Sequence, residues 1–378
     1  MSASQPRHRI CFIGTTLGRG GAEVHLFQAA TGLQERGFDV RVVCMLPRDY
    51  WGVKLEERGI PVRYMNLSRK ATPLPILAQF LRHMAAIKPA AIAGFDYPGA
   101  MLARAGGRLA RVPVIISSIH SENFGGLLRR LALVWTDSFA TATTVVSHRM
   151  SDKLIALGAA SRRVRVIPNG TDMTVVGPHL RARRAALRHA LGIGDTEFLW
   201  LAAGRLEAPK DYPNLLEAMA ILRPAAPHAR LAIAGQGPLE RELRALTTSL
   251  HLDDVVSFLG FREDVHACMA AADATVLASA WEGLPNVVIE SLAAGTPIVS
   301  TDVGGVREVI EEGVSGFIVP PRRSASLAGA MSALMARTPA ELRSMGDAGR
   351  AFVEQCYGVD HVVERWSDLF NDLLREAA

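Results

Sequence analysis

The sequence predicts an α/β protein built from two doubly wound parallel sheets. Short runs of apolar and β-branched residues alternate with helical patterns along all 378 residues. Continuous apolar strands separated by helices indicate parallel sheets covered on both faces. The alternation restarts after residue 170, and a chain of this length has room for two or three domains. We expect an N-terminal domain over 1–172, completed by a last helix over 360–378, and a C-terminal domain over 173–359.

The expected strands are spaced so that a helix fits between each pair. In the first half they lie at 9–14, 39–45, 62–67, 90–95, 112–118, 142–147 and 163–167. In the second half they lie at 197–203, 230–234, 255–259, 274–278, 297–300 and 317–319. A first helix is expected over 22–36, and the last helix carries one apolar stripe of Val362, Trp366, Leu369 and Leu373.

Composition excludes several classes of protein. Apolar residues make up 49% and charged residues 21%, which is a globular mixture. No run approaches the roughly 18 apolar residues of a membrane span, and the N-terminal apolar stretch is too short for a signal peptide. The four cysteines form no C-x-x-C pair, which disfavours a disulfide framework and a zinc site. We therefore expect a cytoplasmic protein.

Charge is divided unequally between the two halves. Residues 1–170 contain 23 Lys and Arg against 10 Asp and Glu, a net charge of +13, whereas the remainder contains 19 against 27, a net charge of −8. A basic half suits anionic lipid, a phosphorylated substrate or nucleic acid. The 6% of aromatic residues and the lack of an RNA-binding signature make nucleic acid the weakest of these three partners.

The stretch 127–135 (LLRRLALVW) is basic and amphipathic. It combines Arg129 and Arg130 with Leu128, Leu131 and Trp135. Such a stretch can lie on an anionic membrane surface. The alternative is a core-packing helix with solvated arginines, and the sequence leaves both readings open.

Glycine-containing loops follow several of the expected strands. The segment 14–23 (GTTLGRGGAE) opens the first helix, and its Gly20 and Gly21 allow close approach of backbone to a ligand. It lacks the spacing of a Walker A or G-x-G-x-x-G loop, so a plain turn is an equal alternative. The segment 204–211 (GRLEAPKD) begins with Gly204 and places Arg205 and Lys210 before a helix expected near Pro213. Two cations beside free N–H groups suit a diphosphate.

The segment 281–290 (WEGLPNVVIE) carries the most information. Pro285 suits the first helical position, which leaves the N–H groups of Asn286 and Val287 directed at a phosphate. Glu282 lies in the preceding loop, and Glu290 is expected about two turns inside the helix. Carboxylates accept hydrogen bonds from sugar hydroxyls well, so each can meet a different part of one ligand.

Four glycine turns are expected to line one edge of the second sheet. They follow strands at Gly204, at Gly235 and Gly237 (GQGP), at 283, and at 304 in the segment 295–308 (GTPIVSTDVGGVRE). Open α/β sheets bind ligands at the carboxyl ends of their strands. In the first half, His120 follows a strand in SSIHSEN and is a candidate active-site residue.

Together these segments resemble the retaining glycosyltransferases of family 4, which have the GT-B fold. The resemblance rests on EGLPNVVIE, GTPIVSTDVGGVRE, GRLEAPKD, IPNG and GGAE, and it covers nearly the whole chain. It implies two Rossmann-like domains facing a central cleft, with a nucleotide-sugar donor in the C-terminal domain and the acceptor side in the N-terminal one. It also implies that the last helix crosses back to the N-terminal domain.

The resemblance also assigns roles to individual residues. It implies that Arg205 and Lys210 bind the donor diphosphate, that Glu290 binds the ribose, and that Glu282 binds a sugar hydroxyl. The backbone of Leu284, Pro285, Asn286 and Val287 would bind the donor as well. Gly20 and Gly21 would approach the donor from the first domain, and His120 would lie near the transferred sugar.

The expected activity is transfer of a sugar from a nucleotide-sugar donor, UDP- or GDP-linked, to a saccharide or lipid-linked saccharide in bacterial surface polysaccharide or glycolipid synthesis. Retention and metal independence are implied by the resemblance; the chain has no D-x-D motif, and no cofactor is expected. The protein could sit peripherally on the inner face of the cytoplasmic membrane. A GT-B-fold nucleotide-sugar epimerase and a non-catalytic sugar-nucleotide binding protein are the alternatives.

Overall fold

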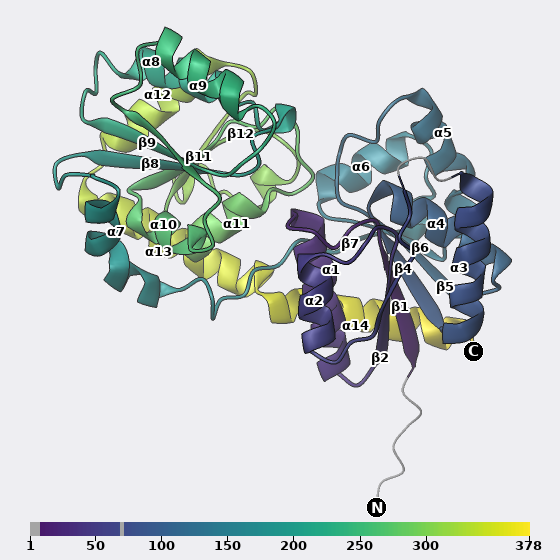
Figure 1. The fold of residues 1–378 in the computed structure, drawn as a ribbon. Coiled ribbons are helices and arrows are strands. Elements are labelled where there is room, and N and C mark those ends of the chain that lie inside the picture. The colour runs from purple at the N-terminus through teal and green to yellow at the C-terminus, as the bar shows by residue number, and fades with distance from the viewer. Residues whose placement is uncertain (1–7, 69–71) are drawn as a thin grey trace, which may run out of the picture. The chain divides into compact units, whose positions relative to one another are not determined.

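A computed structural model describes residues 8–68 and 72–378 of the chain, which form two compact units (Figure 1). Unit 1 comprises Met1–Gly170 and Val359–Ala378, and unit 2 comprises Thr171–Gly358. The chain divides at Gly170 and Gly358, where the sequence led us to expect 172 and 359.

Unit 1 is a parallel sheet covered by helices. Its described strands are ordered β3-β2-β1-β4-β5-β6-β7, and every adjacent pair is parallel. The strands are β1 (Arg9–Gly14), β2 (Asp39–Cys44), β3 (Val62–Tyr64), β4 (Ala91–Phe95), β5 (Val114–Ile119), β6 (Ala142–Val145) and β7 (Val164–Val166). The helices are α1 (Gly21–Glu35), α2 (Tyr50–Glu57), α3 (Pro73–Ile87), α4 (Asp96–Leu109), α5 (Leu127–Trp135), α6 (His148–Ala156) and α14 (Val359–Glu376).

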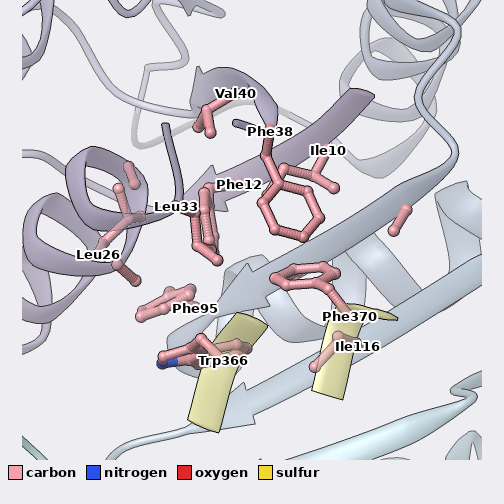
Figure 2. Close-up of a cluster of buried hydrophobic side chains, with 14 of the residues drawn as sticks. Ile10, Phe12, Leu26, Leu33, Phe38, Val40, Phe95, Ile116, Trp366 and Phe370 are labelled. Atoms are coloured by element: carbon pink, nitrogen blue, oxygen red, sulfur yellow. The ribbon is translucent and has the colours of Figure 1, made fainter. Parts of the chain in front are cut away.

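The two faces of the unit 1 sheet bury different side chains of β1. Phe12 packs in one cluster with α1 and α14, and Ile13 packs in a second cluster with α3 and α4. Alternation along a strand causes this separation, because successive side chains point to opposite faces. Figure 2 shows the first cluster, where the ring of Phe12 lies 6.2 Å from Trp366 and 6.0 Å from Phe370 of α14. The C-terminal helix therefore completes the core of unit 1, although unit 2 separates it in sequence.

Unit 2 repeats this architecture with a second parallel sheet. Its described strands are ordered β10-β9-β8-β11-β12-β13. They are β8 (Phe198–Ala203), β9 (Ala229–Ala234), β10 (Val256–Gly260), β11 (Ala274–Leu277), β12 (Ile298–Thr301) and β13 (Gly316–Val319). The helices are α7 (Arg184–Ala190), α8 (Tyr212–Leu222), α9 (Glu240–Ser249), α10 (Val265–Ala271), α11 (Asn286–Ala293), α12 (Ser324–Met335) and α13 (Pro339–Tyr357).

The predicted fold class is confirmed, and each predicted strand appears with its ends shifted by at most a few residues. The predicted stripe of the last helix is also confirmed, because Val362, Trp366, Leu369 and Leu373 are buried. One local prediction was wrong. Pro285 was expected as the first helical residue, but helix α11 begins at Asn286 with Pro285 as its N-cap. After β12, Gly305 leads into a single 3-10 turn over Val306–Glu308.

Each unit contains two of the four cysteines. The cysteines Cys11, Cys44, Cys268 and Cys356 are free thiols, and the first three are buried. Burial raises the pKa of the Cys11 thiol to about 12, so it behaves as a small apolar residue. Among the described helices, none combines the length and hydrophobicity that a membrane crossing requires.

Candidate functional site

The carboxyl ends of β8 and β11 define the candidate site of unit 2. Strand order reverses at β8, with β9 and β10 on one side and β11, β12 and β13 on the other. Doubly wound sheets bind ligands in the crevice at such a switch point, because the loops leave the two strands in opposite directions there. The loops that follow β8 and β11 carry Lys210 and Glu282, which are both among the residues that the sequence pointed to.

Lys210 and Glu282 form an ion pair across the switch point. Lys210 Nζ lies 2.6 Å from Glu282 Oε1, and the two side chains are 21% and 17% exposed. Ser279 Oγ donates to the same carboxylate oxygen at 2.8 Å. The two loops are also joined through the backbone, where Ala280 N donates to Pro209 O at 2.8 Å. Lys210 is the single lysine in residues 171–378, which makes it chemically distinct in this half of the sequence.

Tyr212 supports the loop that carries Lys210. Its hydroxyl donates to the Gly204 carbonyl oxygen at 3.0 Å, and its ring is buried. Burial raises the pKa of Tyr212, and the charge of Glu282 raises it further. The hydroxyl therefore stays protonated and holds the backbone of Gly204 in place.

Two glycine turns bring neighbouring loops into backbone contact. Gly235 has φ +156°, and a Cβ there would collide with the carbonyl oxygen of Gly204. Gly304 has φ +50°, and a Cβ there would collide with the carbonyl oxygen of Gly283. Only glycine combines these backbone angles with such close approach. The prediction that four glycine turns line one edge of the sheet is confirmed for β9, β8, β11 and β12.

Gly237 continues this contact in the loop after β9. A Cβ at Gly237 would collide with the Leu206 carbonyl oxygen, and Leu206 N donates to Gln236 O at 3.0 Å. The loops after β8 and β9 therefore pack as one layer above the strand ends.

Helix α11 begins at the edge of the same site. Val288 N donates to the carbonyl oxygen of Pro285, the N-cap, at 3.1 Å, and the positive end of the helix dipole lies at this N-terminus. Leu284, Pro285 and Val287 are buried and Asn286 is partly exposed. Ser291 fixes the helix to the sheet, since its hydroxyl lies 2.5 Å from Thr275 Oγ1 of β11.

Glu290 pairs with His266, whereas Lys210 pairs with Glu282. Because α11 begins at Asn286, Glu290 is its fifth residue and sits about one turn inside the helix, not two. Its Oε1 lies 3.7 Å from His266 Nε2 of α10. Burial lowers the pKa of His266, but the hydrogen bond and charge of Glu290 outweigh burial and leave it raised. Both side chains keep about a quarter of their surface exposed.

Arg205 takes no part in the ion pair between Lys210 and Glu282. Its guanidinium bonds the Glu207 carboxylate two residues later and is 64% exposed. The exposed side chain has room to reorient, whereas Lys210 is held.

Gly20, Gly21 and His120 belong to unit 1. Gly20 is the N-cap of α1, and Gly21 is the first residue of that helix. His120 follows β5, and its Nε2 lies 2.9 Å from Ser118 Oγ. Its ring stacks on Phe95 at 5.0 Å and faces His25 at 6.2 Å. Burial lowers the pKa of His120 to about 4, although Asn169 opposes this, so the imidazole is neutral at physiological pH.

Sequence reasoning missed three residues of the unit 2 site. For Ser279 and Tyr212 the sequence carried a signal. Ser279 is a polar residue just beyond the end of a strand, and Tyr212 is a polar residue just beyond a charged loop. His266 carried none, since it is separated from Glu290 by 24 positions and only the fold places α10 beside α11. Within the described residues, no group of three or more His, Cys, Asp or Glu side chains has a metal-binding arrangement.

Family models match both units. The model for "Glycosyl transferases group 1" matches residues 183–352, and the model for "Glycosyl transferase 4-like domain" matches residues 20–170. The chain is also 23% identical to HepE of Anabaena, solved with UDP and glucose. That likeness has a TM-score of 0.85 and covers 97% of this chain and 100% of HepE. At this identity it establishes the shared fold alone.

Two curated bacterial relatives share part of the chain. An N-acetyl-alpha-D-glucosaminyl L-malate synthase of Bacillus anthracis is 26% identical over 62% of this chain and 60% of its own length. A UDP-Gal:alpha-D-GlcNAc-diphosphoundecaprenol alpha-1,3-galactosyltransferase of Escherichia coli is 27% identical over 58% of this chain and 59% of its own length. The matches therefore span about three fifths of the length of these two relatives. With both family models matched over most of its length, the chain belongs to the group 1, family 4-like glycosyltransferases.

Proposed function

We propose that the protein is a retaining, metal-independent glycosyltransferase that moves a sugar from a nucleotide-sugar donor to a saccharide or lipid-linked saccharide. The observation that carries this proposal is the Lys210–Glu282 pair at the switch point of unit 2, beside the start of α11. A cation and a helix N-terminus suit a diphosphate, and a carboxylate suits a sugar hydroxyl. A diphosphate and the sugar joined to it are adjacent parts of a nucleotide-sugar.

In the proposed mechanism, Lys210 and the N-terminal end of α11 stabilise the charge that develops on the β-phosphate as the sugar leaves. Preorganised cations and N–H groups do this without reorganisation during the reaction. Arg205 would turn from Glu207 to the diphosphate when the donor binds. Glu282, released from Lys210, would accept a hydrogen bond from the transferred sugar.

Retention follows in this proposal from attack on the face of the sugar that the diphosphate leaves. The leaving phosphate takes the proton of the acceptor hydroxyl. Neutral His120 would serve as a hydrogen-bonding group near the sugar, because an imidazole with a pKa of about 4 carries no charge at pH 7. Glu290 would bind the ribose hydroxyls beside His266, and the backbone of the glycine turns would contact the nucleotide.

The donor is proposed to be UDP- or GDP-linked. HepE, which shares the fold, was solved with UDP, and the name of the Escherichia coli relative specifies a UDP-linked donor and a lipid diphosphate acceptor. These names support synthesis of a bacterial surface polysaccharide or glycolipid as the setting. We propose that no metal or organic cofactor takes part.

A peripheral position on the cytoplasmic face of the membrane is part of the proposal. Helix α5 exposes Leu127, Leu128 and Trp135 at 71%, 82% and 74%, with Arg129 and Arg130 between them. Exposed apolar side chains beside cations suit an anionic bilayer surface. A helix that only packs on the core would account for the burial of Leu133, but not for the exposure of Leu127, Leu128 and Trp135.

The membrane proposal is tested by sedimentation with vesicles of phosphatidylglycerol or phosphatidylcholine. The protein should bind the anionic vesicles, less at high salt, and a Leu127→Ser/Leu128→Ser variant should bind more weakly. Ile221→Ser, which changes an exposed apolar residue of unit 2, is the control. Equal binding by the double variant and the wild type would contradict the proposal.

Transfer is tested by incubating UDP- and GDP-sugars with saccharide acceptors in EDTA and following the anomeric proton of the product. A product with the donor's anomeric configuration supports the proposal. Conversion of the donor without acceptor would identify an epimerase, and donor binding without any turnover would identify a binding protein.

A further inference from the structure

A cavity of about 250 Å³ lies beside strands β1, β2 and β3 of unit 1, next to the end of α3. Among the described residues, every charged one that lines it is an arginine, and the other lining residues are apolar. The arginines are Arg9, Arg41 and Arg63, and the apolar residues include Pro61, Ala86 and Ile87. A cavity lined in this way suits an anion that carries a small organic group.

The three arginines lie on one diagonal across neighbouring strands. Register pairs Arg9 of β1 with Asp39 of β2, and Val43 of β2 with Arg63 of β3. Arg41 lies midway between Asp39 and Val43 on β2. Side chains two residues apart on a strand, or paired in register on neighbouring strands, point to the same face. Because Val43 packs in the cluster beneath α3, the three arginines point to the face that α3 covers.

Two of these guanidinium groups share one carboxylate. Arg9 Nε donates to Asp39 Oδ2 at 2.6 Å, and Arg41 Nη2 lies 2.9 Å from Asp39 Oδ1. Arg9 Nη1 also donates to the carbonyl oxygen of Ile87, the last residue of α3, at 2.7 Å. The side chains of Arg9 and Arg41 remain 42% and 32% exposed. A guanidinium has five N–H donors, so these contacts hold both groups in place and leave donors for a ligand.

Arg63 has no carboxylate partner among the residues that the structure describes. Its side chain is exposed, and residues 1–7 and 69–71, outside the described part, contain no Asp or Glu. Three guanidinium groups therefore share one carboxylate, which leaves an excess of two positive charges at the cavity. An unbalanced group of cations attracts anions.

His83 of α3 lies near the same arginines. It precedes Ile87 by four residues, so the two share one side of the helix. Its Nε2 atom is buried and has no hydrogen-bond partner within the described residues. Burial lowers the pKa of His83, and the charges of Arg63 and Arg82 lower it further. The charges that act on this imidazole are thus positive, which agrees with an excess of cations here.

We infer that this cavity binds a phosphate monoester, with Arg9, Arg41 and Arg63 donating to the phosphate oxygens. A phosphate monoester carries nearly two negative charges at pH 7.5, because its second pKa is about 6, and this matches the excess of cations. Guanidinium groups bind phosphate through paired, charge-assisted hydrogen bonds. Pro61 and Ala86 pack against the organic part of the ligand.

The site is separate from the residues assigned to sugar transfer. Arg9 is the first residue of β1, whereas Gly20 and Gly21 lie in the segment that follows the other end of this strand. The bound phosphate takes no part in the transfer reaction, so its binding can be measured whether or not the protein transfers sugar.

Glycerol 3-phosphate is the probe, and glycerol is its uncharged control. Calorimetric titration at pH 7.5 should show one saturable site for glycerol 3-phosphate and none for glycerol. Arg63→Gln should weaken binding about tenfold or more, because it removes a charge-assisted hydrogen bond. Arg162→Gln, an exposed arginine before β7, removes the same charge at the opposite edge of the sheet and should bind as the wild type does.

A lipid headgroup can present the same phosphate group as a soluble ester. Vesicles of phosphatidic acid in phosphatidylcholine distinguish the two sources, with Leu127→Ser/Leu128→Ser as the background protein so that α5 contributes little. Binding of glycerol 3-phosphate would assign the site to a soluble ester. Vesicle binding that is lost in Arg63→Gln, without binding of glycerol 3-phosphate, would assign it to a lipid phosphate.

Four results overturn the inference. Neither probe binds the wild type, or Arg41→Gln and Arg63→Gln both bind as tightly as the wild type. Arg162→Gln weakens binding as much as Arg63→Gln, which would show a general effect of net charge. Lys210→Met loses the binding of glycerol 3-phosphate, which would place the phosphate in unit 2 instead.

Discussion

Lys210 Nζ lies 2.6 Å from Glu282 Oε1, so the loops that leave β8 and β11 are joined by an ion pair at the point where strand order reverses. Both partners keep about a fifth of their surface exposed, which leaves the pair accessible to a ligand. A diphosphate that binds Lys210 competes with Glu282 and sets its carboxylate free.

Lys210→Met should lower the catalytic efficiency of sugar transfer by about 100- to 1,000-fold, because it removes a preorganised cation from the leaving phosphate. Steady-state kinetics with the donor identified by binding would measure this. Lys54→Met removes an exposed lysine of α2 and should keep wild-type activity. Wild-type catalytic efficiency in Lys210→Met would show that Lys210 does not act on the leaving phosphate.

Glu290→Ala should weaken UDP binding by roughly 10-fold or more, since a hydrogen bond to a charged group contributes about 1.5–3 kcal/mol. Calorimetric titration with UDP and with 2′-deoxy-UDP tests the assigned role. The wild type should discriminate between the two nucleotides, and Glu290→Ala should do so much less. Glu354→Ala, in the exposed part of α13, is the control. Undiminished discrimination in Glu290→Ala would assign the ribose to another residue.

Gly235→Ala should abolish nucleotide binding and destabilise unit 2. The added Cβ would collide with the Gly204 carbonyl oxygen, and φ +156° is strained for alanine. Gly329→Ala, in α12, meets open space and should stabilise the protein by about 0.5–1 kcal/mol. Thermal unfolding with and without UDP compares the two. Equal behaviour of the two variants would contradict the account of the glycine turn.

His120 should make the protein less stable in acid. Its folded pKa of about 4 lies below the ordinary 6.5, so the unfolded state binds more protons between these values. Stability therefore rises with pH across that window, by up to about 3 kcal/mol from this residue. Urea unfolding of His120→Gln at pH 5 and 7.5 should show a smaller pH dependence than the wild type. His361→Gln, in the exposed part of α14, should match the wild type.

The contribution of Asp96 to stability should depend on pH in the opposite direction. Its folded pKa of about 6 lies above the ordinary 3.8, so the folded state binds more protons between these values and stability falls as pH rises through the window. Asp96→Asn should therefore be more stable than the wild type by about 1–3 kcal/mol at pH 7.5, with no difference below pH 4. Urea unfolding at both pH values checks this. An Asp96→Asn protein that is less stable at pH 7.5 would show that the carboxylate is satisfied.

Sequence periodicity was sufficient to predict both sheets, because most of their strands are short runs rich in apolar and β-branched residues, separated by helical patterns. The stripe of Val362, Trp366, Leu369 and Leu373 identified the last helix but not its unit, since a stripe shows which face is buried and not what covers it. The start of α11 was placed one residue early, because Pro285 is equally acceptable as an N-cap.

The site was predictable where a residue type and a strand end coincide, as for Lys210 and Glu282. It was not predictable where contact depends on the packing of separate helices, as for His266 and Glu290. The stack of His25, His120 and Phe95 joins three segments that are distant in sequence, and only the order of strands β1, β4 and β5 brings them together.

Thermal unfolding of the wild type and of Lys210→Met against a panel of UDP-, GDP- and ADP-sugars in EDTA tests the central claim most directly. A donor present at 100 times its dissociation constant should stabilise the wild type by about 2.7 kcal/mol. The account predicts that one member of the panel stabilises the wild type and that Lys210→Met loses most of this effect. A wild type that no nucleotide-sugar stabilises, or a Lys210→Met protein stabilised to the same extent, would contradict it.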